Sequence, residues 1–219
     1  ITYTGNGTAG STIPHGLGVQ PYLVIWKVRN TTDNWLVWSK AMDAATGSTG
    51  WLYLNLTNAK QTSATTNNYP TYKVDPTATL LTVNGAGASD ATNTSGNTYV
   101  VYSFAPIAGY SAFGSFTGNG SADGPFVFTG FRPRWVMFKR TDAANDWFIY
   151  DTSRSTYNAA LVYLLPDSTA AEAGASGNDI DFLSNGFKIR NTNNYDNASG
   201  GTIIYAAFAE NPFKVSRAR

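Results

Sequence analysis

Short apolar runs separated by polar and glycine-rich turns dominate this chain, and the longest arrangement of them occurs twice. Residues 21–29 are typical of a β-strand whose two faces both begin apolar, which predicts a central strand. The polar stretch 30–34 and the apolar stretch 35–38 follow, so the pattern predicts a hairpin. Residues 133–140 and 147–150 repeat this arrangement, with 14 positions from the proline to the tryptophan in each copy. The same hairpin is therefore expected in both halves of the chain.

Two further segments are duplicated, one at the beginning and one at the end of each half. Tyr-Thr-Gly-Asn-Gly at residues 3–7 returns as Phe-Thr-Gly-Asn-Gly at residues 116–120, and residues 95–105 match residues 199–209 without a gap. Each half thus offers several short strands separated by Gly- and Asn-rich turns. This pattern predicts an all-β fold of two tandem related antiparallel β-sandwich units, jelly-roll or lectin-like, in a pseudo-symmetric pair.

The boundaries of the two units follow from the duplication. The first unit is expected at residues 1–108, a short linker at 109–112 and the second unit at 113–219. So short a linker leaves little freedom, so the units are expected to pack together or share a sheet. Helix is expected only at residues 169–173, where Ser168 can cap a single turn.

Composition is compatible with this fold and excludes several classes of partner and site. Hydrophobic residues make up 42% of the 219 residues and aromatic residues 14%, which suits half-buried pleated surfaces. The net charge of +1 argues against nucleic acid as the main partner. The chain has no cysteine, so disulfides and thiolate metal sites are excluded. No apolar run approaches the ~20 residues of a membrane-spanning helix, so membrane insertion is not expected.

Charge is distributed unevenly between the halves. Residues 1–112 hold five basic and four acidic side chains, whereas residues 113–219 hold ten of each. Arg132, Arg134 and Arg140 surround the second long strand and form a candidate interface or basic patch. Acidic neighbours make pairing within the chain or between subunits a better interpretation than nucleic-acid binding.

Catalytic and metal-binding patterns are weak. His15 is the single histidine, and neither a Gly-x-Ser-x-Gly motif nor a cysteine accompanies it. Asp179 and Asp181 are spaced like a carboxylate pair on one strand face, but fourteen acidic residues produce such a pair by chance. The turn at 142–146 carries calcium-type oxygen donors without the spacing of a calcium loop. We therefore expect no enzymatic activity, no cofactor and no metal.

Exposed aromatic residues in loops are the better ligand-binding candidates. Sugar-binding sandwiches stack sugar rings on aromatic side chains, and aromatic rings combine a large apolar face with a polar tip in Tyr and Trp. The tryptophans are expected in the core. The four candidates are loop tyrosines: Tyr69, Tyr72, Tyr157 and Tyr195.

Several stretches carry a resemblance to a known group of proteins. They are residues 130–142, 181–188 and 205–213, together with 103–106 and 110–114. Over almost the whole chain the sequence resembles a repeat family found in virion-associated proteins of tailed, often aquatic, bacteriophages, including tail-fibre and lectin-like proteins. These motifs mark strands and turns, so no functional residue is carried over from the family.

The resemblance implies a location at a virion or extracellular particle surface. The expected function is that of a tail-fibre, receptor-binding or capsid-decorating protein acting by non-covalent binding, with host glycans as the ligand class. Expected partners are other virion proteins and further copies of the chain, as a homo-oligomer such as a trimer. The alternatives are a purely structural virion protein and, third, a glycan-cleaving hydrolase.

Overall fold

The regular structure of this protein is almost entirely antiparallel β-strand. The computed structural model describes residues 1–212 except 43–49, 63–74, 86–91, 175–176 and 178. Within this described part, the single helical element is the 3-10 turn η1, Lys40–Met42. None of the described helical structure has the length and apolar character needed to cross a membrane. The predicted all-β class is confirmed.

The chain divides into two compact units, unit 1 at Ile1–Ala105 and unit 2 at Pro106–Arg219. Each sheet formed by the described residues takes its strands from one unit. The division falls just before the linker expected at 109–112. Ser111 and Ala112 belong to β8, Ser111–Thr117, because they pair with Phe208 and Ala207 of the neighbouring strand. These two positions are therefore strand and not linker.

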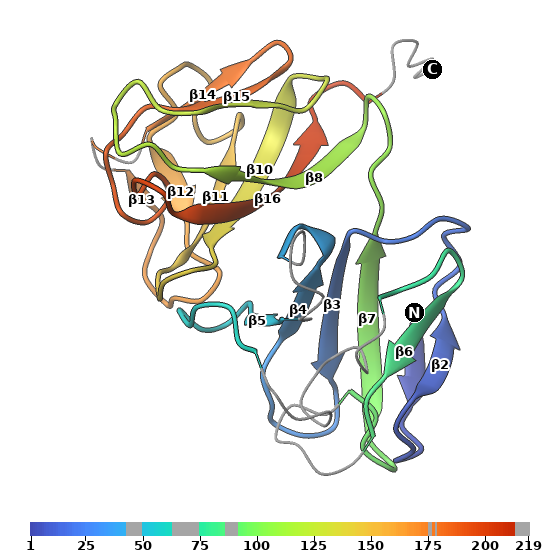
Figure 1. The fold of residues 1–219 in the computed structure, drawn as a ribbon. Helices are drawn as coiled ribbons and strands as arrows, with labels where there is room; N and C mark the ends of the chain where they lie inside the picture. The colour runs from blue at the N-terminus through green and yellow to red at the C-terminus, as the bar shows by residue number, and fades with distance from the viewer. Residues whose placement is uncertain (43–49, 63–74, 86–91, 175–176, 178, 213–219) are drawn as a thin grey trace. The chain divides into compact units, whose positions relative to one another are not determined.

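Unit 1 contains a five-stranded sheet in the order β1-β7-β3-β4-β5 and a two-stranded sheet of β2 and β6 (Figure 1). The strands of the larger sheet are β1 Thr2–Thr4, β3 Leu23–Val28, β4 Leu36–Ser39, β5 Leu52–Tyr53 and β7 Thr98–Phe104. The smaller sheet consists of β2 Ser11–Pro14 and β6 Leu80–Val83. Leu81 of β6 packs with Trp26 of β3, so both sheets contribute to one core.

Unit 2 contains a six-stranded sheet in the order β13-β12-β11-β10-β16-β8 and a three-stranded sheet in the order β14-β15-β9. The remaining strands of the larger sheet are β10 Pro133–Arg140, β11 Trp147–Asp151, β12 Val162–Leu164, β13 Ala173–Gly174 and β16 Thr202–Ala209. The smaller sheet consists of β9 Phe126–Phe128, β14 Ile180–Leu183 and β15 Gly186–Ile189. Figure 1 shows β14 and β15 facing the larger sheet, which is β-sandwich character.

The two larger sheets share a strand order and a register. The order of neighbouring strands is β1-β7-β3-β4-β5 in unit 1 and β8-β16-β10-β11-β12 in unit 2. In both sheets the first strand of the unit lies beside its last strand, and three intervening strands follow in chain order. Thr4 pairs with Thr98 in unit 1, and Thr117 pairs with Thr202 in unit 2. The gap-free match between residues 95–105 and 199–209 is thus reflected in equivalent strand pairing.

Aromatic side chains fill both cores. Trp26 and Trp38 are fully buried in unit 1. In unit 2 the ring of Phe138 lies 5.5 Å from that of Tyr150 and 6.4 Å from that of Phe187, with nearly parallel planes. Phe138 and Phe187 come from facing sheets, so this stack joins the two layers. Offset aromatic stacking adds to the free energy gained by burying these large rings.

The predicted hairpins are confirmed, and the predicted helical turn is wrong. β3 pairs with β4 and β10 pairs with β11. Residues 180–189 form a further hairpin, with Leu183 opposite Gly186. Residues 169–172 are not helical, and β13 begins at Ala173. The Ser168 hydroxyl accepts a hydrogen bond from the Ala170 amide at 3.1 Å, a local turn that competes with helix.

Candidate functional site

The four candidate tyrosines do not define one site. Tyr69 and Tyr72 lie outside the described residues. Tyr157, between β11 and β12, is 85% exposed. Tyr195, between β15 and β16, is 42% exposed, and its ring lies 5.8 Å from that of Phe148. Tyr157 and Tyr195 therefore stand on separate loops, each accessible to solvent.

The three arginines do not form one patch. Arg134 and Arg140 stand at opposite ends of β10, which separates them by roughly 20 Å along the strand. Arg132 pairs with Glu210 at 2.8 Å, and Arg140 binds Asp142 through two of its nitrogens. The Arg134 guanidinium donates to the Ser153 hydroxyl at 2.7 Å. These arginines are committed to contacts within the protein.

His15 is buried, and its imidazole is used in local structure. Nδ1 accepts from the Leu17 amide at 3.2 Å, so Nε2 carries the proton and donates to the Thr77 carbonyl at 3.1 Å. A pocket of about 220 Å³ beside it is lined by Ile1, His15 and residues 101–104, none of which carries a carboxylate. These surroundings offer no base partner for the histidine.

The two aspartates weighed as a catalytic pair have separate partners. The Asp181 carboxylate pairs with Arg190 at 2.6 Å, and the Asp179 carboxylate accepts from the Gly177 amide at 3.0 Å. Asp179 lies immediately before β14, which begins at Ile180.

The turn after β10 is held by a buried lysine. Lys139 is fully buried, and its ammonium donates to the Asn145 carbonyl at 2.6 Å. Burial lowers the pKa of Lys139 to about 8, against the opposing effect of nearby Asp167 and Asp146. Lys27 makes the same contact to the Asp33 carbonyl in unit 1. Among the described residues, no cluster of three or more metal-ligating side chains forms.

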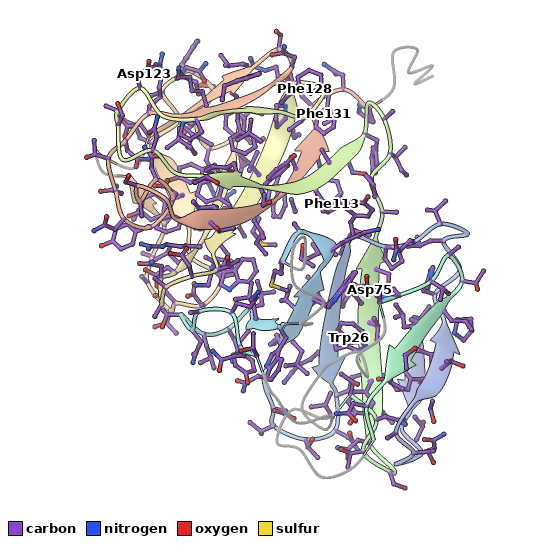
Figure 2. All side chains as sticks on the ribbon, viewed as in Figure 1. Trp26, Asp75, Phe113, Asp123, Phe128 and Phe131 are labelled. Carbon is purple, nitrogen blue, oxygen red and sulfur yellow. The ribbon has the colours of Figure 1, made fainter. Side chains whose placement is uncertain are left out.

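The most distinctive exposed apolar surface of unit 2 lies on strand β9. Phe126 is 46% exposed and Phe128 65%, whereas Val127 between them is buried in the core. The strand order places β9 at an edge of its sheet. Each ring lies beside a glycine, since a Cβ at Gly186 would be 3.0 Å from the Phe126 ring and one at Gly130 3.8 Å from the Phe128 ring. Figure 2 shows Phe128 together with the buried Phe131.

Cross-strand pairing extends this surface over the whole small sheet. Phe126 stands opposite Lys188, which stands opposite Asp181, and such partners share a face of the sheet. Phe128 stands opposite Gly186, which stands opposite Leu183. We call this surface the β9 face, defined by six residues: Phe126, Phe128, Asp181, Leu183, Gly186 and Lys188.

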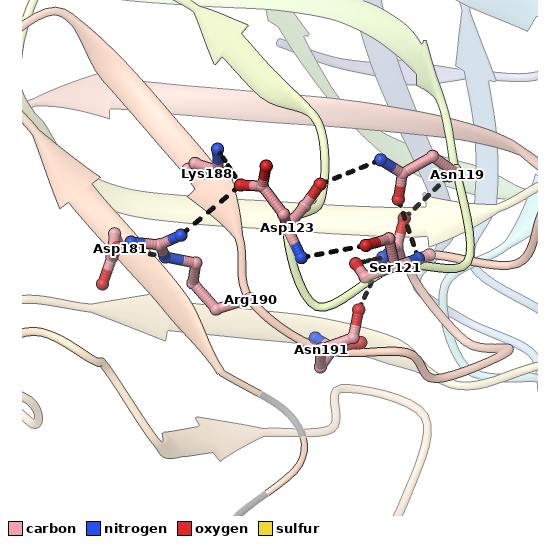
Figure 3. Close-up of polar contacts among 8 residues, drawn as sticks. Asn119, Ser121, Asp123, Asp181, Lys188, Arg190 and Asn191 are labelled. Carbon is pink, nitrogen blue, oxygen red and sulfur yellow. Dashed lines mark hydrogen bonds and ion pairs between the residues drawn. The ribbon is translucent and has the colours of Figure 1, made fainter.

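A charged network borders the phenylalanines. Lys188 Nζ lies 2.6 Å from Asp123 Oδ1, and Arg190 bridges from Asp123 at 3.7 Å to Asp181 at 2.6 Å (Figure 3). The hydrogen bond from Lys188, followed by its charge, lowers the pKa of Asp123 below its ordinary value. Asp123 is therefore an ionised, solvent-exposed hydrogen-bond acceptor.

Hydrogen bonds hold the loop that carries Asp123 in one conformation. Asn119 donates to the Asp123 carbonyl at 3.0 Å, and the Ser121 hydroxyl accepts from the Asp123 amide at 3.1 Å. The fully buried Asn197 accepts from the Asn119 amide at 2.9 Å and donates to the Ser121 carbonyl at 2.7 Å. Figure 3 shows this loop beside the ion pairs. The carboxylate is thus held in place before any ligand arrives.

Unit 1 has the same strand pair without the aromatic surface. Ile13 pairs with the buried Leu81, as Val127 pairs with the buried Phe187 in unit 2. The outward neighbours in unit 1 are Thr12 and Pro14 of β2, paired with Thr82 and Leu80. The fold therefore accepts small residues at the positions that Phe126 and Phe128 occupy.

Phe126 and Phe128 are the candidates that the sequence analysis missed. A Phe-Val-Phe run predicts a strand with both rings on one face, and the larger rings would ordinarily be assigned to the core. The duplication does not supply the missing signal, because Ile13 lies ten positions after Tyr3 whereas Val127 lies eleven after Phe116, and equal spacing would align Ile13 with Phe126. Only the strand pairing shows that Ile13 and Val127 are the equivalent inward positions.

The fold and this surface define an all-β protein of β-sandwich character with an exposed aromatic sheet face. A family model described as a domain of unknown function, DUF7483, matches residues 1–212, so the chain belongs to that family. The match runs across both compact units. No curated protein and no solved structure matches the chain.

Proposed function

We propose that this protein is a non-covalent binding protein that recognises a glycan on a cell surface, and that the β9 face is its ligand site. The observation that carries the proposal is the exposed pair Phe126 and Phe128 on β9, where Phe126 stands opposite the Lys188 that pairs with the ionised Asp123. The C–H groups on one side of a sugar ring pack against the electron-rich face of an aromatic ring. Carboxylate, ammonium and guanidinium groups bind the hydroxyls at the edge of the sugar.

In this proposal the protein belongs to a virion or other extracellular particle, as a tail-fibre, receptor-binding or capsid-decorating component. The virion assignment is supported by the sequence resemblance to virion-associated repeat proteins. In this proposal the two units are tandem related sandwiches of jelly-roll or lectin-like type. Several copies of the chain, as in a trimer, compensate for a weak single site by multivalency. Other virion proteins hold the chain on the particle.

The experiment is a glycan array and a whole-cell binding assay, with the full chain displayed multivalently. The wild type is expected to bind a subset of glycans, and the Phe126→Thr/Phe128→Thr variant is expected to lose that binding. Tyr102→Thr is the matched control, because Tyr102 lies on a strand of unit 1 and is as exposed as Phe126, at 46%. If the wild type in multivalent form binds no glycan and no cell, the proposal is wrong. The alternative of a purely structural virion protein is then favoured.

A further inference from the structure

The charges around the β9 face cancel. Two cations, Lys188 and Arg190, alternate with two anions, Asp123 and Asp181, in one chain of ion pairs. Within this network no charge of either sign is left over, so the network attracts neither an anionic nor a cationic ligand by net charge. It presents hydrogen-bond donors and acceptors side by side at a spacing of a few ångströms.

The exposure of these groups decides which of them meets a ligand. The Asp123 side chain is 81% exposed and that of Arg190 43%, whereas the Asp181 side chain is 13% exposed. Asp123 and Arg190 are therefore the accessible acceptor and donor, and Asp181 holds Arg190 in position. A pair of neighbouring hydroxyl groups can accept from the guanidinium with one oxygen and donate to the carboxylate with the other.

We propose that the β9 face and its charged border select an uncharged oligosaccharide, in which one sugar covers Phe126 and Phe128 with its apolar side and the hydroxyls of a neighbouring sugar bind Asp123 and Arg190. This inference rests on the proposed function and adds the chemical class of the ligand. A sialylated, uronic or sulfated glycan would place its negative charge beside Asp123. That charge would have to displace an existing ion pair at a cost in affinity.

A neighbouring protein or a second copy of the chain fits this surface less well. The centres of protein interfaces are depleted of charged residues, whereas Phe126 here stands opposite Lys188, which belongs to a network of four charged side chains. The aromatic part consists of two rings on a three-residue strand, which is small for a stable protein interface. A ligand the size of one or two sugar rings matches it better.

The test uses the full chain, displayed multivalently, against pairs of glycans that differ in one terminal charged sugar. We expect each neutral member to bind roughly tenfold or more tightly than its charged partner. Binding of the neutral member should change little with salt, since no net charge is exchanged. Asp123→Asn should weaken neutral binding and narrow the difference between the two members, and Tyr102→Thr should change neither.

Each contrary result has a separate meaning. Preference for the charged members, with loss of binding in Phe126→Thr/Phe128→Thr, overturns the inference about charge and leaves the proposed function standing. Absence of binding to every glycan overturns both. A wild type whose oligomeric state by light scattering is lost in the phenylalanine variant identifies the β9 face as an interface between copies, which also overturns the inference.

Discussion

At the scale of single residues, the most informative side chains are two buried asparagines in equivalent places. Asn93 accepts from the Asn6 amide at 3.1 Å and donates to the Thr8 carbonyl at 2.8 Å. Asn197 makes the corresponding bonds to Asn119 and Ser121 in unit 2. The repeated Gly-Asn-Gly segments are therefore turns closed by a buried amide, and not a binding motif.

Removing one of these amides should be costly. Asn197→Ala leaves the Asn119 amide and the Ser121 carbonyl without their buried partner, and each such loss costs about 1–3 kcal/mol. We expect the free energy of unfolding of unit 2 to fall by roughly 2–4 kcal/mol, measured by chemical denaturation. Asn93→Ala is the matched variant in unit 1. Unchanged stability in both variants would contradict the structural role of the asparagines.

Asp196 is a second buried residue with a testable effect. Burial raises its pKa to about 6, partly offset by the hydrogen bond from Asn191 at 3.1 Å. Its other oxygen, Oδ1, has no hydrogen-bond partner among the residues that the structure describes. The charged group near it is Asp179, and Tyr150 also faces it. Ionised Asp196 therefore stands in surroundings that disfavour its charge.

The sign of the pH dependence follows from the raised pKa. Between the ordinary value of 3.8 and about 6, the folded state holds a proton that the unfolded chain has released. The contribution of Asp196 to stability is therefore highest below pH 3.8, falls as pH rises to about 6 and stays low above it.

Asp196→Asn removes this titration. We expect the variant to be more stable than the wild type at pH 7–8 by up to about 3 kcal/mol, a difference that shrinks towards pH 4. Thermal unfolding across this pH range gives the comparison. A variant less stable than the wild type at pH 8 would show that the carboxylate is stabilising there.

At the scale of elements, β9 and β15 depend on a glycine. A Cβ at Gly186 would lie 2.1 Å from the Val127 carbonyl oxygen, closer than packed atoms allow. The equivalent position in unit 1 carries Leu80, so the close approach belongs to unit 2 alone. The small residue keeps β9 tight against β15 and leaves room for the Phe126 ring.

Gly186→Ala should disturb both the strand pair and the aromatic surface. Overpacking of this kind costs roughly 1–3 kcal/mol, so the midpoint of thermal unfolding should fall. Glycan binding should weaken more than it does in Leu80→Ala, the matched change in unit 1. Equal binding by Gly186→Ala and the wild type would show that the ligand does not depend on the geometry of β9.

Sequence alone predicts the strands of this protein better than its surface. The hairpins at 21–38 and 133–150 follow from two apolar runs separated by a polar turn, because apolar runs of this length are typical of buried strands. β5 is shorter than the apolar run at 51–56 suggests: Leu52 and Tyr53 pair with β4, whereas Trp51 makes an isolated bridge with Gln61. The ion pairs of Asp123 with Lys188 and Arg190 join residues more than sixty positions apart, and periodicity carries no information about such contacts.

At the scale of the whole molecule, the two units use one strand order for different surfaces. Unit 1 has small outward residues on β2, and unit 2 has exposed rings and a charge-balanced border on the equivalent strand. The shared positions therefore serve the fold, and the differing positions are where function is expected. Binding by a single β9 face is expected to be weak, and multivalent display to strengthen it.

The most direct test of this account is a map of amide chemical-shift changes when the wild-type protein binds a glycan found on the array. We expect changes concentrated in residues 123–131 and 180–190, which contain the β9 face and its charged border. Unit 1, including Thr12 and Pro14, should be unaffected. Changes confined to unit 1, or to the loops of Tyr157 and Tyr195, would contradict the assignment of the site.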